Sequence, residues 1–292
     1  MSTRNIATII RGLPTSDGAG VKLTRTLGQS RNASDRQRLD PFLLLDEFSS
    51  DNADDYLAGF PAHPHRGFET VTYMLDGHMQ HEDHMGNRGD LGPGDVQWMT
   101  AGRGVIHSEM PQQKEGRMRG FQLWINLPAA EKMQPAAWRD IPATRIPQVD
   151  LDDGARVRVI AGTLRQDDSA IDGPINGAAE RISTDPLYFD VQLPAQGRFE
   201  HPLTAGHNAL VFVYEGSARI GARDLPRHHV GVLSDGDSVQ IEAGPDGARL
   251  LLLAGRPIGE PVVQYGPFVM NSREEIEQAL RDYAEGRLTE AA

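Results

Sequence analysis

Two short pairs of side chains in the first half of the chain have the types and spacing of metal ligands. They are His63-Pro64-His65 and His107-Ser108-Glu109. In extended backbone, residues two apart project from the same face of a strand, about 7 Å apart. If the two pairs lie on neighbouring strands, three imidazoles and one carboxylate surround a single point. Such a ligand set suits Fe, Zn, Ni or Cu, so the sequence predicts a site for a divalent metal.

Glu69 is a second candidate for the carboxylate ligand. If strand parity continues unbroken from His63, Glu69 shares its face and also points inward. Glu109 is two residues from His107, whereas Glu69 is four residues beyond His65 and past Gly67. Spacing alone leaves both carboxylates open as the fourth ligand.

The remaining histidines form no comparable pair. His78, His81 and His84 follow the turn at Asp76-Gly77 and are spaced by three, so on a strand they alternate between faces. We interpret these three residues as solvated or as lining the mouth of a barrel. The other histidines are adjacent in sequence or fall in a predicted loop: His201, His207, His228 and His229.

The segments that must position the two pairs indicate β structure. Short apolar runs are separated by Gly, Pro, Asn and Asp, the pattern of an all-β sandwich or barrel. These runs are residues 5–12, 21–27, 69–75, 96–99 and 121–127. A glycine-rich turn at 100–104 precedes His107 and lets the next strand fold back over the first.

Longer blocks around these residues resemble the pirin family of the cupin superfamily. The blocks are residues 63–70 (HPHRGFET) and residues 94–104 (GDVQWMTAGRG), with Asp40-Pro41-Phe42 before them and residues 120–124 (GFQLW) after. They cover most of the first half, and the second half resembles the family more loosely. The resemblance implies two cupin, jelly-roll-like β-barrels in tandem, with one divalent metal in the first. It implies Fe(II) as that metal, with Mn, Co, Ni, Cu and Zn left open.

The same resemblance implies a ligand set and an activity. The ligands would be His63, His65, His107 and Glu109. With the fourth position taken by Glu109, we expect Glu69 to tune the metal through hydrogen bonds from behind the ligands. The activity would be that of a quercetin 2,3-dioxygenase-like oxidoreductase that cleaves a flavonol or related aromatic enol with O2, and Glu109 would also accept a proton. The alternative is a non-catalytic metal- or redox-sensing regulatory protein that binds a protein partner.

Composition restricts the other partners. The chain has 292 residues, no cysteine and a net charge of −12, with no dense basic run. Without cysteine, any metal must be held by histidine and carboxylate. The acidic balance argues against direct nucleic-acid binding. No run is long and apolar enough for a signal peptide or a membrane span, so we expect a cytoplasmic protein.

The second half repeats the first, and the repeat predicts where the metal is absent. Residues 70–77 align with 209–216 at an offset of 139, and Gly94-Asp95 aligns with Gly236-Asp237 at an offset of 142. A repeat of this length indicates duplication of a whole barrel. By these offsets the ligand positions fall on residues that cannot hold a divalent ion: Pro202, Thr204, Arg249 and Leu251.

The domain boundaries follow from the repeat and from proline content. We predict a metal-binding barrel at 1–135, a proline-rich linker at 136–150, and a metal-free barrel at 151–292. The second barrel would end in a helix at 272–286. Ser272 and Glu275 have the spacing of a capping box at its start.

Overall fold

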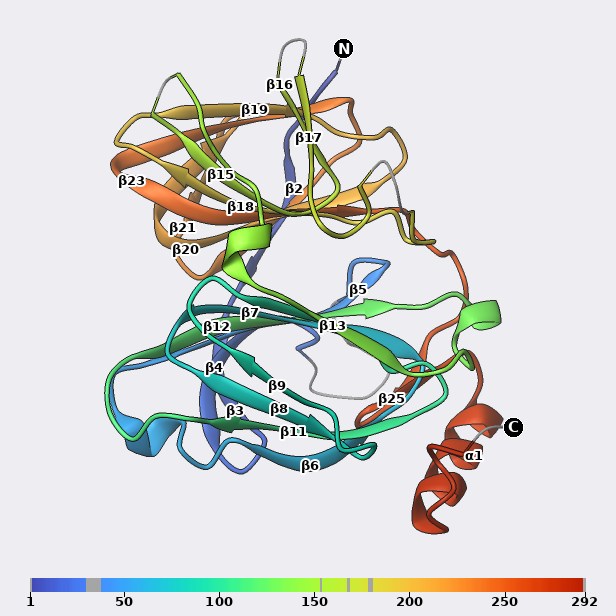
Figure 1. Ribbon diagram of the computed structural model, residues 1–292. Helices are drawn as coiled ribbons and strands as arrows, with labels where there is room; N and C mark the ends of the chain where they lie inside the picture. Colours follow the sequence, from blue (N-terminus) through green and yellow to red (C-terminus); the bar gives the residue numbers. More distant parts are fainter. Residues whose placement is uncertain (1, 30–37, 153, 167–168, 178–180, 291–292) are drawn as a thin grey trace. The chain divides into compact units, whose positions relative to one another are not determined.

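The computed structural model describes residues 2–29, 38–152, 154–166, 169–177 and 181–290. Strands dominate it, and the described part of the chain contains a single α-helix, α1 (Arg273–Ala284) (Figure 1). The prediction of an all-β protein with a C-terminal helix is therefore confirmed. The described residues also form three single-turn 3₁₀ helices: η1 (Ala53–Asp55), η2 (Ala129–Glu131) and η3 (Ala143–Arg145). In the described residues, no helix is long and apolar enough to cross a membrane.

The chain divides into two compact units that differ from the predicted domains. The first unit consists of residues 13–143 and 258–292, and the second of residues 1–12 and 144–257. Both ends of the chain therefore belong to the unit built mainly from the opposite half. The predicted first barrel includes residues 1–12 and the predicted second barrel includes the terminal helix, and the structure differs from both predictions.

Two larger sheets and one two-stranded sheet form the strands of the first unit in the described residues. One is a seven-stranded antiparallel sheet, in order β13 (Ala137–Ile141), β10 (Val96–Thr100), β7 (Phe68–Asp76), β12 (Met118–Asn126), β5 (Phe42–Ser50), β4 (Val21–Leu27) and β3 (Leu13–Asp17). The other has four strands, in order β6 (Phe60–His65), β11 (Val105–Pro111), β8 (Met79–Asp83) and β9 (Arg88–Leu91). A two-stranded sheet, β24 (Val263–Tyr265) with β25 (Phe268–Met270), completes the unit.

The core of the first unit lies between these two sheets. Strand β8 alternates buried and half-buried residues, as period-two patterning requires of a strand with one face on a core. Its Met79 and Leu91 of β9 join one apolar cluster with Leu23, Phe48 and Met74 of the larger sheet. The inward faces of the two sheets are thus the surfaces on which a site inside the barrel must lie.

A ten-stranded sheet forms most of the second unit. Its main path is β14 (Gln148–Asp150), β15 (Arg156–Ala161), β18 (Leu187–Leu193), β23 (Ser238–Gly255), β20 (Asn208–Ile220), β22 (His229–Leu233) and β2 (Ile6–Arg11). Three further strands pair along this path: β1 (Thr3–Arg4), β19 (Arg198–Pro202) and β21 (Arg223–Pro226). A hairpin of β16 (Thr163–Gln166) and β17 (Ser169–Asp172) stands beside them. The long strands β20 and β23 pair antiparallel and supply much of the apolar core.

The N-terminus is held in the second unit by a buried arginine. Arg4 is 1% exposed and donates to three backbone carbonyls, those of Gly236, His207 and Thr204, over 2.7–2.9 Å. Strand β2, blue in Figure 1, pairs with β22 of the same unit. Alternating patterning predicts that this segment is a strand but carries no information on which sheet it joins.

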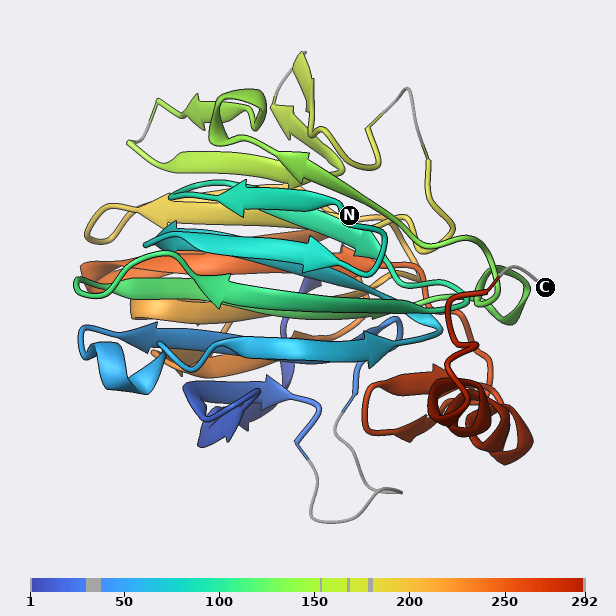
Figure 2. The same cartoon turned by 60° about the horizontal axis from the view of Figure 1, so that its bottom comes forward.

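The C-terminal segment is held in the first unit by another buried arginine. Arg66, 3% exposed, binds Asp282 of α1 at 2.7 Å and donates to the carbonyls of Leu288 and Arg103. Helix α1 packs on the β24–β25 hairpin (Figure 2) through one apolar cluster: Phe268, Met270, Ile276, Ala279 and Leu288. Its start has the predicted capping box between Ser272 and Glu275.

Candidate metal centre

Two neighbouring strands bring the two predicted pairs together. Strands β6 and β11 are antiparallel, and His63 lies directly opposite His107. His65 is two residues from His63, so both imidazoles leave the same face of β6. An irregularity in the pairing follows His107, because Glu109 pairs with Phe60 rather than with Pro61.

The three histidines form a compact cluster. The ligand nitrogens of His63, His65 and His107 all lie within 4.8 Å of one another, and Nε2 of His63 is 3.0 Å from Nε2 of His65. Their ring centroids are 4.4–4.9 Å apart. Among the residues that the structure describes, this is the group of histidine and carboxylate side chains that is close enough to hold a metal ion.

The nitrogens of these rings fit a metal. His65 and His107 are 4% and 2% exposed, and burial, followed by the neighbouring histidines, lowers the pKa of both well below the usual range. Both are therefore neutral at neutral pH, which is the form that binds metal. Within the described chain, neither ring nitrogen of His107 has a hydrogen-bond partner. A buried polar atom without a partner costs free energy, and coordination to a cation would offset that cost.

His63 is held in the tautomer that leaves Nε2 free for a metal. Its Nδ1 lies 2.8 Å from the carbonyl oxygen of Pro61, which can only accept. The proton must therefore be on Nδ1, and the lone pair on Nε2 faces the cluster.

Glu109 lies beside the cluster but is also bound to protein groups. It is 3% exposed, and its Oε1 accepts a hydrogen bond from Thr72 Oγ1 at 2.8 Å. Gln122 Nε2 donates to Oε2 at 3.2 Å. The group of mutually close ligand atoms contains the three histidines and not Glu109. Its role as fourth ligand therefore stays a prediction.

Glu69 does not share the face of the cluster. Thr72, which reaches Glu109, is three residues from Glu69 on β7, so the two side chains leave opposite faces. Glu69 instead accepts a hydrogen bond from Thr100 at 2.7 Å. The parity expected from His63 does not continue to Glu69, because β6 ends at His65 and Gly67, with a φ of +90°, turns the chain before β7 begins at Phe68. The predicted inward position of Glu69 behind the ligands is wrong for this reason.

Of the three histidines predicted to be solvated or to line the mouth of a barrel, His81 differs from the prediction. His78 and His84 are exposed, but His81 of β8 is completely buried. Its ring is 4.8 Å from that of His107 and stacks on Trp138 at 4.9 Å, and its Nδ1 contacts Gln97. The alternation of β8 places His81 on the same inward face as Met79, a signal that the three-residue spacing obscured.

A cavity of about 560 Å³ opens beside the histidines. Its apolar lining includes the larger side chains Leu23, Leu44, Phe48, Phe60, Met79 and Trp124. Polar groups in the wall include Thr72, Gln122 and the ion pair of Arg25 with Asp46, whose two contacts measure 2.9 and 2.7 Å. A cavity of this size, mostly apolar with few polar groups, is typical of small-molecule sites. Sequence patterning gave no indication of Thr72 and Gln122, because both are polar residues inside apolar strands.

Strand pairing corrects the counterparts of the ligands in the second unit. Val239 of β23 lies opposite His201 of β19, as His107 lies opposite His63. Ala243 pairs with Ala218 in the same way that Pro111 pairs with Met79. Ile241, two residues before Ala243, is therefore equivalent to Glu109, two residues before Pro111. The counterparts of His63, His65, His107 and Glu109 are thus His201, Leu203, Val239 and Ile241.

The residues predicted by a fixed offset were different: Pro202, Thr204, Arg249 and Leu251. The offset failed because Gly236-Asp237 resembles Gly94-Asp95 in residue type only. The amide of Gly94 binds the carbonyl of Met74, and in the second unit the amide of His228 makes the matching bond to Val213. His201 is also on a strand rather than in the predicted loop. Three of the four counterparts are apolar, so the set cannot hold a metal in the way of the first unit.

Two family models match the chain. The model described as Pirin matches residues 20–125, and the model described as Pirin C-terminal cupin domain matches residues 188–289. A Pseudomonas aeruginosa protein provisionally named a quercetin 2,3-dioxygenase is 55% identical over 98% of both chains. Human pirin is 39% identical over 97% of this chain and 93% of its own.

A solved structure agrees with these sequence matches. The crystal structure of a quercetin 2,3-dioxygenase from Acinetobacter baumannii covers 98% of this chain and 99% of its own, with a TM-score of 0.85 and 32% identity. The predicted pair of cupin-type barrels is confirmed by this likeness and by the second family model.

Proposed function

The chain belongs to the pirin family, and from this we propose that it is a metal-dependent dioxygenase that cleaves a flavonol or a related aromatic enol. The observation that carries the proposal is the cluster of His63, His65 and His107 at the wall of a largely apolar cavity. The names of two relatives support the same reaction, since one is provisionally named a quercetin 2,3-dioxygenase and the other is named a quercetin 2,3-dioxygenase.

One divalent metal would be held by the three histidines together with Glu109. Fe(II) is the metal that we propose, since the histidine-rich donor set suits it and leaves positions open for ligands. When bound, the metal would supply Lewis-acid activation of the substrate hydroxyl beside dioxygen. The geometry of the donor set alone does not select among Fe, Mn, Co, Ni, Cu and Zn.

The residues of the chain would orient the substrate and take its proton. The ring system would contact Phe48, Phe60 and Trp124 in the apolar part of the cavity. Glu109 would accept the hydroxyl proton on a carboxylate oxygen, because Thr72 and Gln122 hold that carboxylate at the cavity wall. The paired Arg25 and Asp46 would bind other polar groups of the substrate.

Oxygen consumption tests the proposal. Protein reconstituted with Fe(II) under anaerobic conditions is mixed with quercetin, and O2 uptake is followed after air is admitted. We expect O2 uptake to match the decrease in quercetin absorbance. In Glu109→Gln, neither O2 uptake nor the decrease in absorbance should occur. Glu82→Gln is the matched control, because Glu82 pairs with Arg88 on the exposed side of β8.

The same experiment separates the alternatives. Quercetin that binds anaerobically without later O2 uptake would indicate a binding or regulatory protein rather than a dioxygenase. Uptake that is equal in wild type and Glu109→Gln would contradict the role of Glu109.

A further inference from the structure

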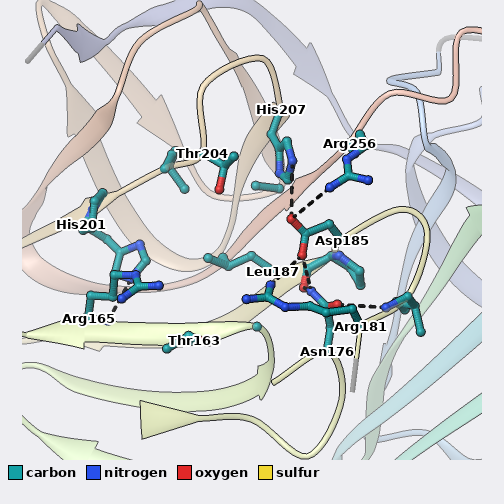
Figure 3. Close-up of a pocket in the computed structure, with 16 residues that line it drawn as sticks. Thr163, Arg165, Asn176, Arg181, Asp185, Leu187, His201, Thr204, His207 and Arg256 are labelled. Carbon is teal, nitrogen blue, oxygen red and sulfur yellow. Dashed lines mark hydrogen bonds and ion pairs between the residues drawn. The ribbon is translucent and has the colours of Figure 1, made fainter. Parts of the chain in front are cut away.

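The second unit contains a cavity of its own that the proposed reaction does not use. Its volume is about 380 Å³ (Figure 3), within the range of small-molecule sites. Three arginines, two histidines and one acid provide its charged and titratable lining: Arg165, Arg181, Arg256, His201, His207 and Asp185. Among the lining residues that the structure describes, Asp185 is the only acid.

His201 presents an unused donor at this cavity. It is 2% exposed, and its ring is fixed between Phe189, in a T-shaped contact at 5.0 Å, and Phe199, stacked at 6.1 Å. Its Nε2 accepts the backbone N–H of Arg165 at 3.2 Å. Burial lowers the pKa of His201 to about 4, so the ring is neutral and the proton is on Nδ1.

This Nδ1–H makes no hydrogen bond of normal geometry in the described part of the chain, although the backbone carbonyls of Thr163 and Pro202 lie near the ring and raise its pKa against the effect of burial. A buried donor without an acceptor costs free energy unless a ligand supplies the acceptor. Because His201 is the counterpart of His63, one histidine of the metal site is retained here, while the other three positions are apolar. Metal coordination of the kind expected in the first unit therefore does not account for this imidazole.

The opposite side of the cavity is built around Asp185. Asn176 donates to it at 2.8 Å and Arg181 at 2.9 Å, while His207 and Arg256 lie 3.6 and 3.8 Å away. Figure 3 shows this group on one side, with His201 and Arg165 on the other. The lining thus holds one carboxylate and three guanidinium groups, each with five donors, and only Arg181 and Arg256 approach the carboxylate. The arginines that line the cavity therefore carry more hydrogen-bond donors and more positive charge than the single carboxylate of Asp185 can pair.

We propose that this cavity binds a small organic anion, whose carboxylate or phosphate group is held by Arg165 and by the Nδ1–H of His201. Arg181 and Arg256 add positive charge at the rim, and the planar guanidinium groups match the geometry of either oxyanion. The volume accommodates a ligand of metabolite size but not a macromolecule.

Calorimetric titration of the full-length, metal-loaded protein tests the proposal, with succinate and inorganic phosphate as the two probes and chloride at equal ionic strength as reference. We expect one saturable site per chain for at least one probe. Arg165→Ala and His201→Phe should each lower the affinity for that probe by about tenfold or more, which is the effect of losing one hydrogen bond to a charged group. His201→Phe should fold, because it keeps a ring between Phe189 and Phe199. If it does not fold, Arg165→Ala still tests the proposal, because Arg165 is exposed and its loss should not disturb the core.

Two controls make the result decisive. Arg219→Ala removes an exposed arginine of the same unit, paired with Asp224 outside the cavity, and should change affinity by less than about twofold. His107→Ala disrupts the cluster in the first unit and should leave probe binding intact. No saturable binding of either probe, equal loss in Arg165→Ala and Arg219→Ala, or loss of binding in His107→Ala would each overturn the proposal. None of these results depends on dioxygenase activity.

Discussion

Thr72 donates a hydrogen bond to Glu109 over 2.8 Å, and this contact joins the two sheets of the first unit at the metal centre. Thr72 belongs to β7 of the larger sheet and Glu109 to β11 of the smaller one. The contact also fixes which face of β7 is turned to the cluster. Because Glu69 is three residues away on the same strand, the contact places Glu69 on the other face.

Glu109 and Glu69 should respond differently to the same substitution. Glu109→Gln is expected to weaken metal binding, because a neutral amide is a poor ligand beside three histidines. Glu69→Gln should retain the metal. Metal content per chain, measured side by side by elemental analysis, checks both. Metal loss in Glu69→Gln together with retention in Glu109→Gln would show that the ligand assignment is wrong.

Thr72→Val should loosen Glu109 without changing the volume of the side chain. The carboxylate would keep only its contact with Gln122, and loss of such a supporting hydrogen bond lowers metal affinity by roughly 10–100-fold. Competition with a chelator of known affinity measures the change. Thr100→Val is the matched control, since its hydroxyl binds Glu69 rather than Glu109. Equal affinity in both variants would mean that Thr72 does not position the carboxylate.

Glu69 should make stability depend on pH. Burial raises its pKa to about 7 despite donation from Thr100 and Trp98, compared with an ordinary value of 4.5. The folded state therefore binds the proton more tightly than the unfolded chain. Its contribution to stability is complete below pH 4.5 and is lost as pH rises through 7.

Glu69→Gln removes this dependence. In metal-free protein we expect the variant to gain about 1–3 kcal/mol in free energy of unfolding at alkaline pH, relative to wild type, and the gain to shrink as pH falls. Urea denaturation at pH values on either side of this window measures it. Glu82→Gln, which changes an exposed carboxylate, should show no such trend. A gain of the same size at every pH would exclude ionisation of Glu69 as its cause.

Removal of the metal should lower the melting temperature without unfolding the protein. An ion that binds only the folded state stabilises it by mass action, which at saturation corresponds to about 5–10 °C for a unit of this size. The apolar cores of both units do not involve the cluster, so the fold should persist. Thermal unfolding before and after chelation tests this. Loss of β-sheet circular dichroism at room temperature after chelation would instead indicate a structural metal.

The protein should bind one metal per chain. In the second unit, the counterparts of three ligands are Leu203, Val239 and Ile241, and an aliphatic side chain cannot coordinate an ion. Elemental analysis of protein purified without a metal-affinity tag should give one equivalent, and His107→Ala should abolish it. Two tightly held equivalents would contradict this assignment.

The sequence by itself determined the class of fold and the histidine pairs. Alternating apolar runs and turn residues are local signals, and they sufficed for an all-β chain with a capped terminal helix. The pairs at His63 and His107 could be found because period-two geometry makes residues two apart share a face. The family resemblance then indicated that the chain forms two cupin barrels in tandem.

Only the tertiary structure decided where the ends of the chain and several site residues lie. Strand patterning does not specify a pairing partner, so the exchange of both termini, held by Arg4 and Arg66, was invisible in the sequence. Parity failed at Gly67 because strand alternation does not carry through the turn between β6 and β7, and Glu69 was misplaced as a result. His81 became part of the site surroundings through packing on Trp138, a contact between residues 57 positions apart. Local periodicity fixes the face of a strand, whereas contacts between distant segments depend on how the strands pair and pack.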